Sequence, residues 1–375
     1  MRSLAFLLLL SVAASHAQSI PVPSLSARAW LLMDYASGQV LAAQEADTRL
    51  EPASLTKVMT TYLVADALAQ KTLNLQQSVT VSERAWRTQG SRSFVPVNKA
   101  VVVDDLFKGM VIQSGNDASV ALAEAIGGSE GAFADMMNRM AQRMGLQDTH
   151  FLNASGYFEG PTPNHYSTAR DLARLAAALI RDHPETHALH ATREYTYNGI
   201  RQHNRNRLLW ADSTVDGLKT GHSSAAGFCL IATAKRGPRR LISVVLGTAS
   251  EEARARDSLN LLNWGFTGFD AVKLYDKGQA ISRIKVFKGQ QSVVAAGFAE
   301  DFVVSVPRGM ADRLSVQLVS RQPLIAPVAA GATVATLKLA VDGKAWGEYP
   351  VVAQSAVPVA GLPGRLWDEL RLFFQ

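Results

Sequence analysis

The segment Pro52-Ala53-Ser54-Leu55-Thr56-Lys57 marks the beginning of the helix around which this chain is organised. Proline favours the first turn of a helix, and apolar residues then recur at helical spacing as far as residue 69: Met59, Leu63, Ala67 and Leu68. Side chains three positions apart on a helix share one face, with about 5–6 Å between their Cβ atoms. We therefore expect the Ser54 hydroxyl and the Lys57 amine to lie within reach of each other.

Two further short motifs follow in order, Ser114-Gly115-Asn116 and Lys219-Thr220-Gly221. Each is weak alone, because the chain repeats the Ser-x-x-Lys pattern at 282–285 and the Ser-x-Asn pattern at 258–260. Residues 282–285 lie in a strand-like segment, where an offset of three places side chains on opposite faces. Only the copy at Ser54 predicts two cooperating groups.

A free hydroxyl is a poor nucleophile and needs a base within hydrogen-bond distance. Lys57 can be that base if burial or a second cation lowers its pKa, and Lys219 could supply the second charge. The positive end of the helix dipole near Ser54 would stabilise negative charge on an attacked carbonyl. The residues thus favour Ser54 as nucleophile and Lys57 as base.

The surrounding pattern predicts an α/β (α+β) domain with a helical block and an antiparallel sheet drawn from both ends of the segment 18–270. Strands are expected at 29–34, 39–42, 194–197, 228–234 and 240–247, and helices at 57–69, 117–126, 131–144, 168–180 and 254–266.

The composition changes near residue 270. Short Val-rich runs punctuated by Gly and Pro predict a small all-β domain over 271–357. Within the last segment, 358–375, apolar and aromatic residues gather on one side of a predicted helix: Leu366, Trp367, Leu370, Phe373 and Phe374. Such an amphipathic helix is typical of a membrane interface; docking on its own domain is the alternative.

The first 17 residues predict a cleavable export signal. Arg2 precedes a short apolar stretch, and Ser15-His16-Ala17 offers a cleavage site. No later segment approaches the roughly 20 apolar residues of a membrane-spanning helix. We expect an exported protein held peripherally at the periplasmic side of the cytoplasmic membrane.

The composition limits the classes of protein to which the chain can belong. The chain has 375 residues, 47% hydrophobic and 19% charged, with a net charge of +6 and no Lys/Arg run. These values fit a globular protein and give little support to nucleic-acid binding. The single cysteine, Cys229, excludes an intrachain disulfide and a Cys-based zinc site, and we expect it to be packed in the core.

A metal site at His183, His187 and His190 is a weaker interpretation than surface histidines at a helix end. Pro184 interrupts the helix, and no matching carboxylate motif is present. No metal or cofactor is expected.

The three motifs, in this order and with Ser114 and Lys219 lying 60 and 165 residues after Ser54, match the β-lactamase and penicillin-binding-protein set. More widely, the sequence resembles the D-alanyl-D-alanine carboxypeptidases among low-molecular-mass penicillin-binding proteins. The resemblance implies a β-lactamase/transpeptidase-like catalytic domain. It extends over essentially the whole chain after the signal and includes the stretches 32–35, 52–57, 113–118, 198–202, 204–206, 215–222 and 264–266.

The resemblance also implies roles for matching residues. Ser54 would attack the carbonyl between the last two D-alanines of a peptidoglycan stem pentapeptide and release D-alanine. Ser114 would relay the leaving-group proton, and Asn116 would bind the substrate amide. The backbone N–H groups of Ser54 and His222 would form the oxyanion hole.

The strand that carries Lys219, Thr220 and Gly221 would lie along the substrate peptide. Gly221 allows a close approach, while Lys219 and Thr220 would hold the terminal carboxylate. Arg201 and Arg254 are further candidates for this carboxylate, with surface ion pairs as the equal alternative. The same resemblance implies covalent acylation by penicillins. Which group is the acylation base is disputed in this superfamily.

Two other functions fit the sequence less well. A secreted β-lactamase of class A needs a Glu that activates water, and the surroundings of Glu159 do not resemble that site. A catalytically idle wall-binding protein would have lost the nucleophile or the base, and neither Ser54 nor Lys57 is missing. The sequence therefore predicts an exported serine D-Ala-D-Ala carboxypeptidase.

Overall fold

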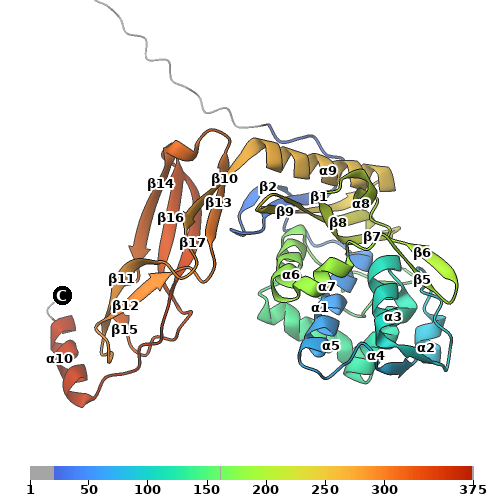
Figure 1. The fold of residues 1–375 in the computed structure, drawn as a ribbon, viewed down its shortest axis with the longest axis horizontal. Helices are drawn as coiled ribbons and strands as arrows, with labels where there is room; N and C mark the ends of the chain where they lie inside the picture. Colours follow the sequence, from blue (N-terminus) through green and yellow to red (C-terminus); the bar gives the residue numbers. More distant parts are fainter. Residues whose placement is uncertain (1–20, 161, 374–375) are drawn as a thin grey trace, which may run out of the picture.

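The computed structural model describes residues 21–160 and 162–373, and the first of its two domains is built on a five-stranded antiparallel sheet (Figure 1). The strand order is β2-β1-β9-β8-β7, so the N-terminal hairpin pairs with the end of the domain, for instance Leu31 opposite Val244. The strands are β1 (Ala29–Asp34), β2 (Val40–Gln44), β7 (Val215–Ser223), β8 (Gly227–Arg236) and β9 (Arg239–Thr248). This confirms the sheet expected from both ends of the segment.

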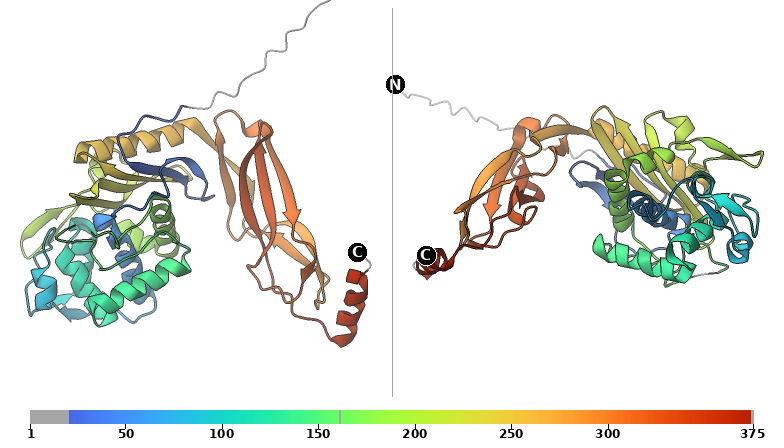
Figure 2. Two further views of the ribbon diagram at one scale, coloured as in Figure 1. Left: turned by 180° about the vertical axis from the view of Figure 1, so that it is seen from behind. Right: turned by 60° about the horizontal axis from the view of Figure 1, so that its bottom comes forward.

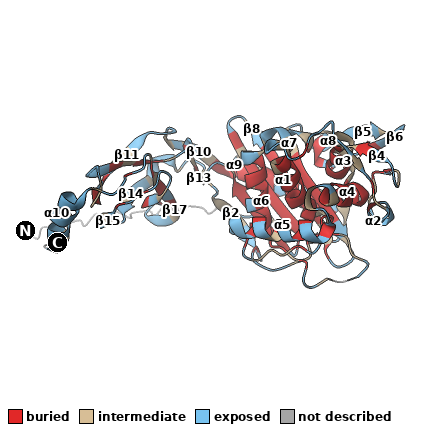
Figure 3. Ribbon diagram, turned by 90° about the horizontal axis from the view of Figure 1, so that it is seen from below, coloured by how far each residue is buried: buried red, intermediate tan, exposed pale blue. Residues whose placement is uncertain are grey.

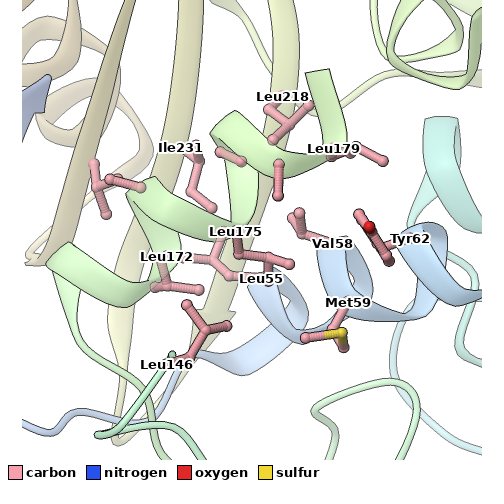
Figure 4. Packing of buried hydrophobic residues seen from close by; sticks show 14 of the residues in the cluster. Leu55, Val58, Met59, Tyr62, Leu146, Leu172, Leu175, Leu179, Leu218 and Ile231 are labelled. Carbon is pink, nitrogen blue, oxygen red and sulfur yellow. The ribbon is translucent and has the colours of Figure 1, made fainter. Parts of the chain in front are cut away.

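Alternation along β1 explains why helices cover both faces of this sheet. Leu31 and Met33 belong to the apolar core that includes α1 and α6, whereas Trp30 and Leu32 belong to the core beneath α9. Successive strand residues point to opposite faces, so one apolar strand serves both layers. Figure 4 shows the first of these cores, in which residues of α1 and α6 meet Leu218 and Ile231 of the sheet.

The helices and short strands of this domain agree with the predicted pattern, since each predicted helix is present with ends that differ by a few residues. They are η1 (Ala53–Thr56, 3₁₀), α1 (Lys57–Ala69), α2 (Glu83–Arg87), α3 (Val103–Lys108), η2 (Gly109–Gln113, π), α4 (Asn116–Gly127), α5 (Glu130–Arg143), α6 (Ala169–Asp182), α7 (Pro184–Leu189), α8 (Leu208–Ala211) and α9 (Glu251–Gly268). Two small hairpins accompany them, β3 (Ser78–Thr80) with β4 (Ala100–Val102), and β5 (Glu194–Tyr197) with β6 (Ile200–His203).

An all-β domain follows, as predicted, and α9 runs directly into its first strand (Figures 1 and 2). Its elements are β10 (Phe269–Tyr275), β11 (Ala280–Phe287), β12 (Val293–Gly297), β13 (Phe302–Pro307), η3 (Ala311–Arg313), β14 (Leu314–Ser320), β15 (Leu324–Ile325), β16 (Thr333–Val341) and β17 (Lys344–Ala353). Strands β10 and β13 pair with each other, and the other six form a sheet in the order β14-β16-β17-β12-β11-β15. The repeat Ser282…Lys285 lies in β11, so its serine and lysine do point to opposite faces.

Arg239 ties the two domains together. Its guanidinium contacts the Asp34 carboxylate at 3.2 Å and donates to the Ser305 hydroxyl of the β-domain at 2.7 Å. The same group donates to the carbonyls of Gly265 and Phe269, at the point where α9 becomes β10. Because Arg239 and Asp34 are both buried, their polar groups depend on these partners.

The chain ends in helix α10 (Leu362–Phe373), which projects from the β-domain with most of its side chains exposed (Figure 3). The Asp368 carboxylate accepts from the backbone N–H of Lys288, and Glu369 pairs with the Lys288 ammonium. The large apolar residues of α10 are exposed: Leu362, Leu366, Trp367, Leu370 and Phe373. Among the described residues, every helix is too short or too polar to cross a bilayer. The predicted export signal lies outside the described residues.

Two predictions about single residues have different outcomes. Cys229 is fully buried in β8, as expected. The prediction of surface histidines at 183–190 is wrong for His187 and His190, which are buried because α7 packs against β7. His190 makes a 2.8 Å hydrogen bond through Nδ1 to the Leu218 carbonyl oxygen, and burial lowers its pKa to about 3.

Candidate functional site

Ser54 lies in a tight 3₁₀ turn immediately before α1, rather than in the regular helix expected. Its neighbour Ala53 has a positive φ of 46°, a strained conformation for a residue with a side chain. A Cβ on Gly156 would come within 1.9 Å of the Ala53 carbonyl oxygen, so this turn packs directly against the backbone at Gly156. The turn holds Ser54 at the rim of a cleft and begins α1 at Lys57.

Lys57 is fully buried and reaches Ser54. Its Nζ lies 3.0 Å from the Ser54 hydroxyl, 2.6 Å from Asn116 Oδ1 and 2.8 Å from the Ser155 carbonyl oxygen. All three acceptors are neutral. Burial, assisted by repulsion from the Arg205 guanidinium, lowers the pKa of Lys57 to about 7, while Asp117 acts weakly in the opposite direction. A substantial fraction of Lys57 is then unprotonated near neutral pH and can accept a proton.

The second motif sits between two helices. The π-helix η2 ends at Ser114, whose φ of 69° turns the chain into α4. A Cβ at Gly115 would lie 1.9 Å from Ser93 Oγ, so a larger residue here would displace the Ser93 side chain. Asn116 bridges the site, because its Oδ1 accepts from Lys57 while its Nδ2 donates to the Gln89 carbonyl at 2.6 Å.

The third motif brings a second buried lysine from β7. Lys219 Nζ donates to the Ser114 hydroxyl at 2.9 Å and to the Thr220 carbonyl at 3.1 Å. Burial is the main cause that lowers the pKa of Lys219 well below its ordinary value, and the cations Lys57, Arg205 and Arg254 add to it. The expected contact between Ser54 and Lys57 is thus present, and the structure adds a second one between Ser114 and Lys219.

A cleft of about 460 Å³ joins the three motifs. β7 is the terminal strand of the sheet, and the turn that carries Ser54 packs on it: a Cβ at Gly221 would come within 2.8 Å of the Pro52 carbonyl oxygen. The lining consists of Ser54, Gly90, Ser91, Ser114, Asn116, Gly156, Tyr157, Phe158, Arg205, Thr220, Gly221, His222, Ser223, Ser224, Glu251 and Arg254. The cleft therefore runs along the outer edge of β7 from Thr220 onward.

Of the two arginines considered for binding the carboxylate, only one lines the cleft. Arg254 lines the cleft; it is buried, donates to the Gly221 carbonyl at 3.3 Å and contacts Glu251. Arg201 does not line the cleft, because it sits on the β5–β6 hairpin and makes an exposed ion pair with Glu194 at 2.6 Å. His222 is in the cleft, with its ring stacked on Phe228 at 4.0 Å between centroids.

The sequence reasoning missed Arg205, which lines the cleft and has no ion pair within the described part of the chain. It lies in the quoted stretch 204–206, four residues after Arg201, but residue type alone did not distinguish the two. Tyr157 and Phe158, which form one wall, were also missed. Glu159 lines a different hollow beside Arg84 and Arg87, so it is not placed to activate water at Ser54.

Asp117, to which the sequence reasoning also gave no role, holds the backbone segment 91–95 in place beside the cleft. Its buried carboxylate accepts hydrogen bonds from the backbone N–H groups of Ser93 at 2.8 Å and Phe94 at 2.9 Å. Residues 91–95 are thereby fixed beside Asn116. Across residues 21–160 and 162–373, no three His, Cys, Asp or Glu side chains are grouped to hold a metal ion.

Comparison with known proteins gives consistent matches. The family model for D-alanyl-D-alanine carboxypeptidase (Peptidase_S11) matches residues 14–250, and that for the penicillin-binding protein 5 C-terminal domain matches 269–359. The chain is 42% identical to D-alanyl-D-alanine carboxypeptidase DacC of Escherichia coli K12 over 99% of this chain and 94% of that protein. It is 37% identical to D-alanyl-D-alanine carboxypeptidase DacA of the same organism over 97% of this chain and 93% of that protein.

Solved structures agree with these matches. Penicillin-binding protein 5 from Haemophilus influenzae superposes with a TM-score of 0.81 at 38% identity, covering 91% of this chain and all of that one. Penicillin-binding protein D2 from Listeria monocytogenes, determined in an ampicillin-bound form, has a TM-score of 0.58 at 33% identity and covers 66% of this chain and 99% of that one.

The geometry predicts how acylation of Ser54 depends on pH. Below a pKa of about 7, Lys57 holds a proton and cannot accept one from Ser54, so the rate should fall about tenfold per pH unit. Single-turnover acylation by an activated thioester, followed by mass spectrometry between about pH 5.5 and about pH 8.5, measures this. The rate should rise with pH to a plateau above about pH 7, and Lys57→Arg should abolish the plateau; a rate that is flat below neutral pH would exclude Lys57 as the base.

Proposed function

The chain belongs to the D-alanyl-D-alanine carboxypeptidase family, and we propose that Ser54 carries out its reaction by removing the terminal D-alanine from peptidoglycan stem pentapeptides through an acyl-enzyme. One observation above all supports this proposal. Lys57 is buried 3.0 Å from the Ser54 hydroxyl with only neutral acceptors around it, which is the environment of a lysine base.

Acylation begins when Ser54 Oγ attacks the carbonyl carbon of the penultimate D-alanine and its proton passes to Lys57. The negative charge that forms on the carbonyl oxygen is bound by the backbone N–H groups of Ser54 and His222. The C–N bond then breaks. Its nitrogen takes up the proton that left Ser54, passed from Lys57 through the Ser114 hydroxyl, to which Lys219 donates at 2.9 Å. D-alanine then leaves, and Lys57 is again unprotonated.

Positively charged side chains at the cleft could bind the free carboxylate of the substrate's terminal D-alanine. Thr220 lines the cleft directly after Lys219, so both would lie beside the leaving residue. Arg205, which has no ion pair within residues 21–160 and 162–373, lines the same cleft and could bind this carboxylate. Asn116 is held by Lys57 on one side and Gln89 on the other, so its position suits binding of the substrate amide. Arg254 supports the strand through the Gly221 carbonyl.

Deacylation repeats the same proton transfers with water in place of the serine hydroxyl. Lys57 takes a proton from the attacking water, the ester bond to Ser54 breaks, and the Ser54 oxygen regains a proton. A β-lactam ring presents a similar carbonyl, and the ampicillin-bound form of the Listeria relative supports acylation of Ser54 by penicillins. The β-domain, with its match to the penicillin-binding protein 5 C-terminal domain, favours a carboxypeptidase over a secreted β-lactamase.

For location, we propose export and attachment of α10 to the outer face of the cytoplasmic membrane. The acidic residues Asp368 and Glu369 tie α10 to Lys288 of the β-domain, which leaves its apolar residues exposed. Trp367 is 60% exposed and Leu366 66%, an arrangement that suits burial at a lipid interface.

D-alanine release from diacetyl-L-Lys-D-Ala-D-Ala by residues 18–375 tests the reaction and its nucleophile together. Ser54→Ala removes the attacking oxygen and should lower kcat by at least about 10³-fold. Ser282→Ala is the matched control, because it removes the serine of the repeated pattern in β11 and should leave release unchanged. Equal release by the parent and Ser54→Ala would contradict the mechanism, and no release by folded parent would contradict the function.

Co-sedimentation with phosphatidylethanolamine–phosphatidylglycerol vesicles tests the membrane proposal. Leu366→Glu combined with Leu370→Glu places two charges on the exposed apolar face and should lower the bound fraction at least about tenfold, because a charged group does not enter the lipid. Val316→Glu with Val319→Glu makes the same charge change on exposed residues of β14 and should bind like the parent. Equal binding by all three proteins would contradict attachment through α10.

A further inference from the structure

The outer edge of β7 changes character at Lys219. From Thr220 to Ser224 the residues line the cleft, where a peptide can lie along the strand. Immediately before Lys219, the backbone carbonyls are already occupied by side chains. Asn206 Nδ2 donates to the Gly217 carbonyl oxygen at 2.8 Å, and His190 Nδ1 bonds to the Leu218 carbonyl oxygen at 2.8 Å.

These two side chains are themselves held rigidly. His190 is fully buried and Asn206 is 1% exposed. Asn204 donates to the carbonyl of His190 and accepts from the backbone N–H of Asn206, so one residue braces both. Asn206 Oδ1 in turn accepts from the backbone N–H of Leu208 at 3.2 Å. With these bonds made inside the protein, neither carbonyl is free to pair with a peptide.

The spacing along β7 shows where a substrate must stop. Gly221 is level with the turn that carries Ser54, since a Cβ there would meet the Pro52 carbonyl oxygen. Leu218 is three residues earlier, or about 10 Å at the rise of a strand. At about 3.3 Å per residue, the leaving residue would lie level with Thr220 and its carboxylate level with Lys219. A peptide that continued past this point would reach Leu218, where His190 and Asn206 occupy the edge.

We propose that His190 and Asn206 form an end stop that makes the site accept only the terminal residue of a peptide as leaving group. They are positioning residues, because they act by closing the strand edge and do not touch the reacting atoms. This inference rests on the proposed function, in which Lys219 and Thr220 hold the carboxylate. The end stop explains why the site would remove a terminal residue and would not cut inside a longer or cross-linked peptide. The restriction then comes from the occupied backbone carbonyls as well as from the charge that binds the carboxylate.

Three substrates separate the end stop from charge recognition: diacetyl-L-Lys-D-Ala-D-Ala, its C-terminal amide, and the same peptide extended by glycinamide. The amide and the extended peptide both lack a carboxylate beside Lys219, so the ratio of their kcat/KM values reports the length restriction alone. The parent should cleave the extended peptide at least about tenfold more slowly than the amide. His190→Ala and Asn206→Ala each open the edge and should bring the two rates within about threefold.

Two controls exclude a general loss of structure. His187→Ala removes a neighbouring buried histidine, which packs beside Gly217 but bonds to the Thr233 hydroxyl and not to an edge carbonyl, and its ratio should stay at the parent value. His190→Asn, which keeps a donor, should restore much of the restriction. Penicillin acylation of Ser54 measures the folded fraction of each variant. If only one of His190→Ala and Asn206→Ala folds, that variant is sufficient for comparison with the parent.

If an acylated His190→Ala or Asn206→Ala variant keeps the parent ratio of kcat/KM values for the amide and the extended peptide, the end stop is overturned. It is also overturned if His187→Ala shifts this ratio, because the effect would then be one of general packing. The free-acid peptide reports the proposed function separately. Failure of the parent to release D-alanine from it would contradict that function, whereas release with an unchanged ratio contradicts the end stop alone.

Discussion

Two lysine ammonium groups are buried side by side with neutral partners, and the organisation of the catalytic domain depends on this arrangement. Lys57 and Lys219 have no ion pair among the described residues; serine hydroxyls, an asparagine and backbone carbonyls surround them instead. A buried cation without a counter-ion is costly, and the cost falls when the group loses its proton. The same burial that disfavours the charged form therefore creates a base beside Ser54.

The fold supplies that burial by bringing together a helical block and a sheet. Ser54 and Lys57 come from the beginning of α1, Ser114 and Asn116 from the junction of η2 and α4, and Lys219 from the edge of β7. Each motif lies at the end or edge of an element, where backbone groups are free to face a substrate. The β-domain joins through Asp34 at the end of β1 and Arg239 at the beginning of β9, and it does not contribute to the lining of the cleft.

Sequence reasoning predicted the parts that depend on local spacing. The Ser54–Lys57 contact follows from a three-residue offset at a helix start, and the rejection of Ser282 and Lys285 follows from the strand that holds them. It failed where tertiary packing decides. Arg201 and Arg205 are four residues apart and chemically equal, but a hairpin carries one outward while the other lines the cleft. His187 and His190 were misplaced because the packing of a six-residue helix on β7 leaves no periodic signal.

A titration of the Lys57 side chain tests the central claim most directly. In protein carrying ¹³C-labelled lysine, the Cε signal assigned by its loss in Lys57→Arg should shift with a midpoint near pH 7, because burial and Arg205 disfavour the ammonium form. Arg205→Gln, which removes the repelling charge, should move that midpoint upward. A Lys57 signal that titrates near the ordinary lysine value of about 10.4 would contradict the account, because Lys57 would then be protonated throughout the working range.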